Sequence, residues 1–172
     1  MQTGNDSIAS LFPALAKEAG REGFAAIAEK WTSHALAAGE VLIQSGQSVD
    51  SVFLLVSGRL TVTLMTGSTA LDVGSHGPGA ILGEVSLLDP GPSSATVRAS
   101  EPSEVSGISR AALGALETEH PRAASAILHT LSHTLVERVR QATDRLDELL
   151  GAPAPREGLF DAARALLGIE KG

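Results

Sequence analysis

Between residues 36 and 110 the chain consists of short apolar runs separated by turns of Gly, Ser, Asp and Pro. Runs of this length and spacing are typical of antiparallel β-strands. A parallel sheet would need a crossover of a dozen or more residues, usually a helix, between successive strands, and the turns leave no room for one. The sequence therefore predicts an antiparallel sandwich or barrel, with strands at Val41–Gln44, Ser51–Val56, Arg59–Met65, Ala70–Val73, Ala95–Ala99 and Glu104–Ser109.

Helical patterns flank this β-rich region. Apolar residues recur at helical spacing in residues 7–35, and a short helix is predicted at Arg110–Glu119. Pro121 then opens a long helix, which the Gly and Pro residues after Leu150 end. We divide the chain into an N-terminal helical segment (1–35), a β-barrel (36–120), a C-terminal helix (121–150), and a linker with an amphipathic tail helix (151–172).

The long helix carries a seam of mostly apolar residues with alternating spacings of four and three. This a/d heptad pattern predicts a homodimer through residues 121–150, and the alternative is a helix packed on its own barrel. The tail helix could dock on the barrel, bind a protein partner, or mark where a longer protein was cut. The seam comprises Leu128, Ser132, Leu135, Val139, Ala142, Leu146 and Leu149.

Charge and composition narrow the possible partners. The chain has a formal net charge of −7, and residues 41–120 contain three arginines and eight acidic residues. Without a basic region, we expect no nucleic-acid partner. The absence of cysteine excludes disulfides and Cys-based zinc sites or nucleophiles. No apolar run approaches the ~20 residues that span a bilayer, and no signal peptide is visible, so we expect no membrane association and a cytoplasmic location.

The most informative segment runs from Gly79 to Ala99 and reads GAILGEVSLLDPGPSSATVRA. It resembles the phosphate-binding cassette of the cyclic nucleotide-binding domain family, which includes catabolite-activator regulators, kinase regulatory subunits and nucleotide-gated channels. That cassette has the form G-x-x-x-G-E-apolar-x-apolar, followed by R-small-A-x-V-x-A. The resemblance extends over residues 10–150, with further matches at Gly39-Glu40, Gly46 and Val52–Leu60. It implies a jelly-roll barrel of eight strands with flanking helices, and cAMP or cGMP as the ligand.

The resemblance also implies a set of binding residues. Gly83 lets the backbone approach the ligand, and the amides of Glu84, Val85 and Ser86 face the phosphate from a helix N-terminus. Glu84 accepts a hydrogen bond from the ribose 2′-hydroxyl, although a charge at the helix N-terminus is the structural alternative. The remaining members are Ser93, Ser94 and Ala95 near the phosphate, Val73 and His76 near the purine, and Thr143 on the long helix. The alternatives are a turn histidine that faces water for His76 and an exposed helix threonine for Thr143.

One departure from the family pattern bears on function. The family's arginine that pairs with the phosphate falls on Ser93, and Arg98 lies about 16 Å further along an extended strand. Alternation places Arg98 on the face opposite Ala95, Val97 and Ala99, and either face could line the pocket. Losing a charge-assisted bond worth roughly 1.5–3 kcal/mol weakens binding about ten- to a hundredfold. Three hypotheses remain: a weakened cyclic nucleotide sensor, a jelly-roll scaffold for protein contacts without a ligand, and a pocket for another ligand.

No catalytic motif is present. The sequence lacks the nucleophile-elbow, P-loop and dinucleotide-binding patterns, and a cupin enzyme would need a His-x-His that is missing. The spacing of His129, His133 and Glu137 indicates a solvated helix face more than a metal site. The 22 residues after Leu150 are too few for the helix-turn-helix domain of the catabolite activators. We therefore expect a regulatory sensor module, not an enzyme, without a metal or other cofactor, that signals through its C-terminal helix.

Overall fold

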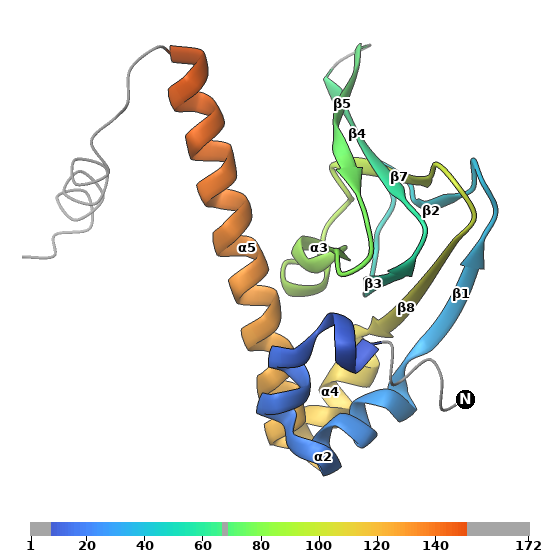
Figure 1. Cartoon of the computed structure of the whole chain (residues 1–172), viewed down its shortest axis with the longest axis vertical. Helices are drawn as coiled ribbons and strands as arrows, with labels where there is room; N and C mark the ends of the chain where they lie inside the picture. Colours follow the sequence, from blue (N-terminus) through green and yellow to red (C-terminus); the bar gives the residue numbers. More distant parts are fainter. Residues whose placement is uncertain (1–7, 67–68, 151–172) are drawn as a thin grey trace, which may run out of the picture. The chain divides into compact units, whose positions relative to one another are not determined.

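The protein is described here by a computed structural model that covers residues 8–66 and 69–150 (Figure 1). Its contacts divide the chain into two units, residues 1–135 and 136–172. Among the described residues, the strands and the helices α2, α3 and α4 belong to the first unit, and helix α5 runs from the first unit into the second. The elements are α2 (Pro13–Lys30), β1 (Thr32–Leu36), β2 (Val41–Ile43), β3 (Ser51–Ser57), β4 (Leu60–Thr66), β5 (Thr69–His76), β6 (Ile81–Leu82), α3 (Glu84–Leu88), β7 (Ala95–Ala99), β8 (Ser103–Ser109), α4 (Arg110–Glu119) and α5 (Pro121–Leu150).

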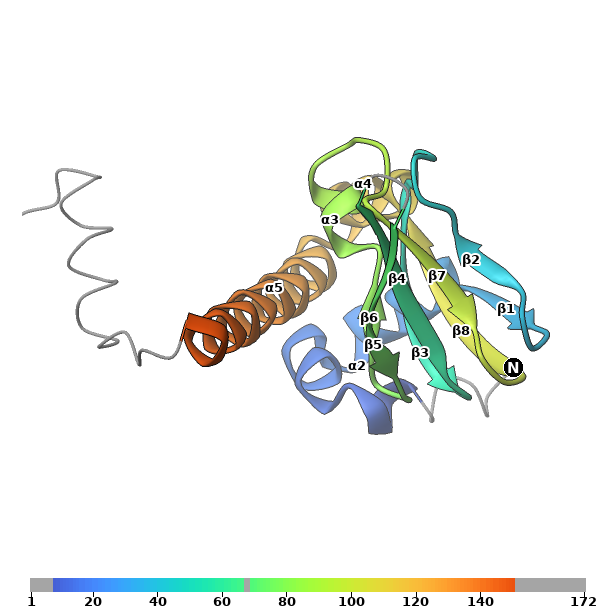
Figure 2. The same cartoon turned by 90° about the horizontal axis from the view of Figure 1, so that it is seen from above.

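The eight strands form two antiparallel sheets, one with the order β1-β8-β3-β6 and the other with the order β2-β7-β4-β5 (Figure 2). Together with the flanking helices, this arrangement confirms the predicted jelly roll. All six predicted strands are present, with ends that differ by no more than three residues, and the predicted bounds of α4 and α5 are those observed.

Two of the observed strands were not predicted from the sequence. The helical segment predicted to reach residue 35 ends at Lys30, and Thr32–Leu36 instead forms β1, which pairs with β8 from Thr32↔Gly107 to Leu36↔Ser103. Four of its five residues are exposed, so β1 lacks an apolar alternation. The other missed strand, β6, has only two residues and pairs with β3.

Two apolar clusters stabilise the first unit. The first fills the space between the sheets, where Leu55, Leu60 and Val105 are completely buried. The second joins β3 and β8 to α2, α4 and the first half of α5, and Ile27, Leu116 and other buried side chains belong to it. Complete burial of an aliphatic side chain contributes roughly 1.5–3 kcal/mol. Strands β3 and β8 of the first sheet therefore contribute apolar side chains to both clusters.

The helices have distinct local features. Gly20 breaks the regularity of α2 with a φ of +71°, and the Ser109 hydroxyl caps α4 by accepting from the Ala112 amide at 3.1 Å. In the second unit, the described residues are the second half of α5, where Val139 is 66% exposed. Within the described part of the chain, no helix combines the length and apolar character needed to cross a membrane.

Candidate functional site

The cassette, defined here as residues 83–95, begins at a glycine that no other residue can replace without strain. Gly83 has a φ of +85°, in the left-handed region that disfavours side chains. A Cβ atom at this position would lie 2.6 Å from the Ser51 carbonyl oxygen. Gly83 therefore lets α3 start directly against the first residue of β3.

The short helix α3 presents two different faces. Glu84, Ser86 and Leu87 are buried, whereas Val85 and Leu88 are 56% and 40% exposed. Leu87 belongs to the apolar cluster formed with α2, α4 and α5, so it anchors the cassette in the helical part of the first unit. The exposed face of α3 is apolar.

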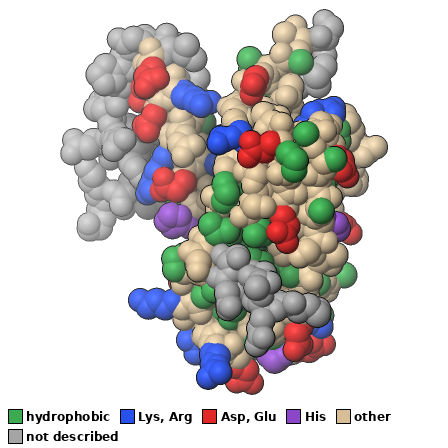
Figure 3. All heavy atoms as spheres, turned by 45° about the vertical axis from the view of Figure 1, so that its right-hand side comes forward, with side chains coloured by type: hydrophobic (Ala, Val, Ile, Leu, Met, Phe, Trp, Pro, Cys, Tyr) green, Lys and Arg blue, Asp and Glu red, His purple; other side chains and the backbone are tan. Residues whose placement is uncertain are grey.

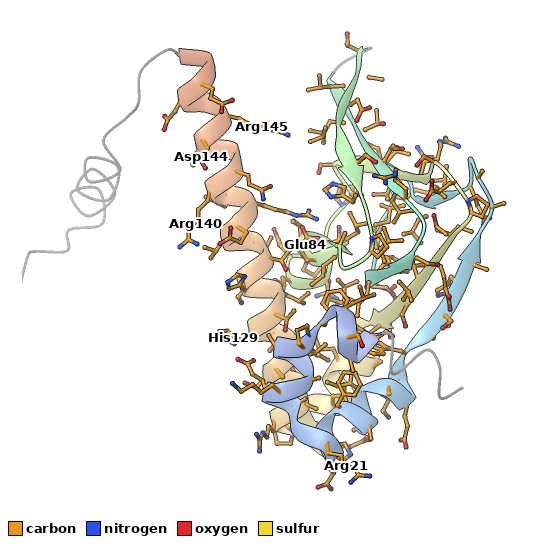
Figure 4. The ribbon with its side chains drawn as sticks, viewed as in Figure 1. Arg21, Glu84, His129, Arg140, Asp144 and Arg145 are labelled. Atoms are coloured by element: carbon orange, nitrogen blue, oxygen red, sulfur yellow. The ribbon has the colours of Figure 1, made fainter. Side chains whose placement is uncertain are left out.

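Glu84 is an acidic residue of the cassette that is buried. Its side chain is only 1% exposed at the first position of α3 (Figure 4). A carboxylate stabilises a helix N-terminus even when it is exposed to solvent. Burial of a carboxylate is not needed for this effect, and it costs free energy that polar contacts must offset. The environment of Glu84 therefore differs from that of an ordinary helix-terminal charge.

The second half of the cassette is held by backbone and hydroxyl groups. The Ser93 amide donates to the Gln47 carbonyl at 2.9 Å, and the Gly46 amide donates to the Ser93 carbonyl at 2.8 Å. The Ser93 hydroxyl donates to the carbonyl of Ala95 at 2.9 Å and accepts from its amide at 3.3 Å. Ser94 is exposed. The hydroxyl at the family's arginine position is thus engaged with the peptide groups of Ala95.

The three arginines of the barrel lie outside the cassette. Arg98 lies on the exposed face of β7, opposite the buried Val97 and Ala99, and bonds the Gly39 carbonyl. Arg59 is exposed in the turn before β4. Arg110 donates from Nη2 to the Ser86 carbonyl at 2.5 Å. Sequence reasoning missed this last contact, because 24 residues separate its partners.

The residues predicted to contact the base occupy other elements. Val73 and His76 are half-buried on β5, an edge strand of the second sheet. Thr143 belongs to the second unit, where its hydroxyl donates to the Val139 carbonyl at 2.9 Å. Its contribution to a ligand site stays a prediction.

Outside the cassette, the helices contain open cavities of about 320 and 420 Å³. Neither cavity is lined by a predicted site residue. His129, which the sequence places on a polar helix face, lies on α5 (Figure 4). Its Nδ1 atom pairs with the Glu18 carboxylate at 2.7 Å. Among the described residues, no group of three or more His, Asp or Glu side chains is arranged to hold a metal ion. Acidic and basic side chains are interspersed on the face drawn in Figure 3.

Comparison with known proteins agrees with this architecture. The family model of the cyclic nucleotide-binding domain matches residues 33–120. A cyclic nucleotide-binding domain from Methylobacillus flagellatus KT superposes with a TM-score of 0.75 at 24% identity, and the match covers 89% of this chain and 88% of that one. The Thermus thermophilus catabolite activator protein gives a TM-score of 0.67 at 27% identity, covering 79% and 62% of the two chains.

Among curated proteins, patatin-like phospholipase domain-containing protein 6 of Pongo abelii is 29% identical over 130 residues. That match covers 75% of this chain but only 9% of the relative, so the chain spans less than a tenth of the length of this curated relative. The family model covers more than half of the chain, and it includes the whole cassette. The chain belongs to the cyclic nucleotide-binding domain family.

Proposed function

We propose that this protein is a regulatory sensor module whose cassette binds a cyclic nucleotide, cAMP or cGMP, with weakened affinity. The observation that carries the proposal is the pairing of Gly83, in its left-handed conformation against β3, with the buried carboxylate of Glu84. A scaffold that used the cassette only to connect two strands would not require a buried carboxylate at this point. A binding site for a ribose hydroxyl gives Glu84 a function.

In the proposed complex, the phosphate lies against the backbone that Gly83 opens, and it accepts from the amides of Glu84, Val85 and Ser86. Glu84 accepts from the ribose 2′-hydroxyl. The phosphate then reaches the second half of the cassette, where Ser93, Ser94 and the Ala95 amide act as neutral donors. On the remaining side, Val73 lies near the base.

The expected affinity follows from these donors. Neutral hydrogen bonds contribute roughly 0.5–1.5 kcal/mol each, compared with roughly 1.5–3 kcal/mol for bonds to a charged group. The acidic barrel also opposes the approach of a phosphate diester, because it lowers the local concentration of anions. Both effects reduce affinity without removing the site.

A second candidate function is a jelly-roll scaffold that acts through protein contacts alone. The hydrogen bonds of Ser93 favour it, because its hydroxyl already accepts from the Ala95 amide that the phosphate would otherwise use. In this case the cassette keeps its shape without a ligand. The two functions differ in whether any cyclic nucleotide stabilises the protein.

Isothermal titration with cAMP and cGMP tests the proposal on the wild type and on Ser93→Arg, with Ser94→Arg as the matched control. We expect weak wild-type binding and an affinity about ten- to a hundredfold higher for Ser93→Arg. The arginine at position 94 should give no such gain, because its side chain starts from an exposed neighbouring position. If neither the wild type nor Ser93→Arg binds at millimolar nucleotide, the cyclic nucleotide sensor function is wrong, which leaves the scaffold and a pocket for another ligand.

We further propose that the module forms a homodimer through α5 and transmits its signal through this helix. The seam position Val139 is 66% exposed, so it is available to a second copy. Light scattering on Val139→Asp, with Gln141→Asp as an off-seam control, tests this. A wild-type dimer that only Val139→Asp dissociates supports the proposal, and a wild-type monomer contradicts it. The tail, for which the sequence suggested a protein partner, lies outside the described residues. A cytoplasmic location remains our prediction.

A further inference from the structure

Arg110, the first residue of α4, joins three parts of the first unit. Its amide donates to the Asp50 carbonyl before β3 at 2.7 Å. Its guanidinium Nη2 donates to the Ser86 carbonyl on α3 at 2.5 Å. The preceding residue, Ser109, caps α4. One side chain therefore connects the cassette helix to the start of α4.

The carbonyl that Arg110 bonds lacks its usual partner for a reason visible in the sequence. In an α-helix the Ser86 carbonyl would accept from the amide of residue 90, as the Val85 carbonyl accepts from the Asp89 amide at 2.8 Å. Residue 90 is Pro90, which has no amide hydrogen. The guanidinium of Arg110 takes the place of the missing donor.

Arg110 is poorly placed for its own helix. A cation at a helix N-terminus opposes the macrodipole, whereas a cation at a helix C-terminus is favoured. Arg110 stands at the N-terminus of α4 and bonds a carbonyl near the C-terminal end of α3. Its position is therefore explained by its contact with α3, and departures from local preference of this kind concentrate at functional positions.

An apolar connection runs beside this polar one. Leu87, which follows Ser86, belongs to the same buried cluster as Leu113 and Leu116 of α4. The apolar cluster alone permits small sliding between the two helices, because packing has no fixed direction. The planar guanidinium adds a directional bond that fixes the separation of α3 from α4.

We propose that Arg110 is a positioning residue that makes α3 and the first turn of α4 open and move as one body. A displacement of the cassette on ligand binding would then reach α4 through the guanidinium. The signalling part of this inference rests on the proposed sensor function, whereas the mechanical coupling exists with or without a ligand.

Amide hydrogen exchange on the ligand-free protein tests the coupling in wild type, Arg110→Met and the control Arg59→Met. Arg59 is an exposed barrel arginine whose hydrogen bonds to Ser100 and Ser103 are made by its backbone. In Arg110→Met we expect exchange about tenfold faster at residues 87–89 and 112–114 together, with the central strands unchanged. In Arg59→Met, both segments should keep their wild-type rates.

Two results would overturn the inference. Faster exchange confined to α4, with residues 87–89 unchanged, would show that the two helices open separately. An equal acceleration at all slowly exchanging amides would show a purely structural role, because it reports lower global stability. Should Arg110→Met fail to fold, Arg110→Lys decides the question: it retains the charge but loses the planar fork, and the same two segments should exchange about threefold faster.

A second arm adds the ligand. In Ser93→Arg, cyclic nucleotide should slow exchange in both α3 and α4, and in Ser93→Arg combined with Arg110→Met only α3 should be slowed. Protection of α4 in the double variant equal to that in Ser93→Arg would contradict transmission through Arg110. If Ser93→Arg binds no nucleotide, the sensor function fails, and the ligand-free measurement still decides the coupling.

Discussion

The two halves of the cassette are built in different ways. The first half, Gly83–Leu88, is fixed by a close backbone approach to β3 and by the side chain of Leu87, which is buried in the helical cluster. The second half, residues 89–95, is fixed by backbone pairing with residues 46–48 and by the hydroxyl of Ser93. The residues that shape the cassette therefore match the family pattern, whereas the position that would carry its positive charge holds a serine. We therefore expect the first half to contribute more to the stability of the cassette than the second.

The comparison predicts the largest loss of stability at Leu87. We expect Leu87→Ala to lower the free energy of unfolding by about 2–5 kcal/mol, because it leaves a cavity in the helical cluster. Leu88→Ala is the matched control on the same helix, and its side chain is 40% exposed, so a much smaller loss is expected. Chemical denaturation measures both. Equal losses would show that α3 has no anchored face.

We expect Gly83→Ala to cause the next largest loss of stability. The left-handed φ disfavours a side chain by about 1–2 kcal/mol, and the contact with the Ser51 carbonyl raises the expected loss to about 2–4 kcal/mol. Gly91→Ala serves as the control in the second half, because a Cβ there would meet no atom within 4 Å. Thermal unfolding should separate the two variants by several degrees. A Gly83→Ala protein as stable as Gly91→Ala would remove the distinction between the halves.

Glu84→Gln tests the functional part of the first half. On the Ser93→Arg background, we expect this substitution to weaken cyclic nucleotide binding about tenfold, because the amide loses the charge that strengthens the bond to the ribose hydroxyl. Titration with 2′-deoxy-cAMP gives the control, since this ligand lacks the hydroxyl and should be insensitive to the substitution. Equal weakening for both ligands would place Glu84 in a structural role.

The antiparallel architecture could be predicted because short apolar runs are separated by turns that contain glycine and proline, and the resemblance of the cassette then indicated the jelly roll. The prediction failed at β1, where four of five residues are exposed, and at the two-residue β6, which is too short to show any period. The residues Gly83 and Glu84 were recognisable as a local motif. The contact of Arg110 with Ser86 was not, because it joins distant parts of the chain, although a proline four residues after Ser86 indicates that its carbonyl needs another donor.

The smallest expected effect is that of Ser93→Ala. Removing the hydroxyl deletes its bonds to the Ala95 peptide groups, which are local and half-exposed, so we expect a loss of only about 0.5–1 kcal/mol. Ser94→Ala, at an exposed position, should change stability less, and denaturation curves of both report the difference. If Ser93→Ala lost as much stability as Gly83→Ala, the second half would carry as much of the fold as the first. The serine at the arginine position would then be a structural replacement, and restoring an arginine there would destabilise the cassette instead of recovering a ligand.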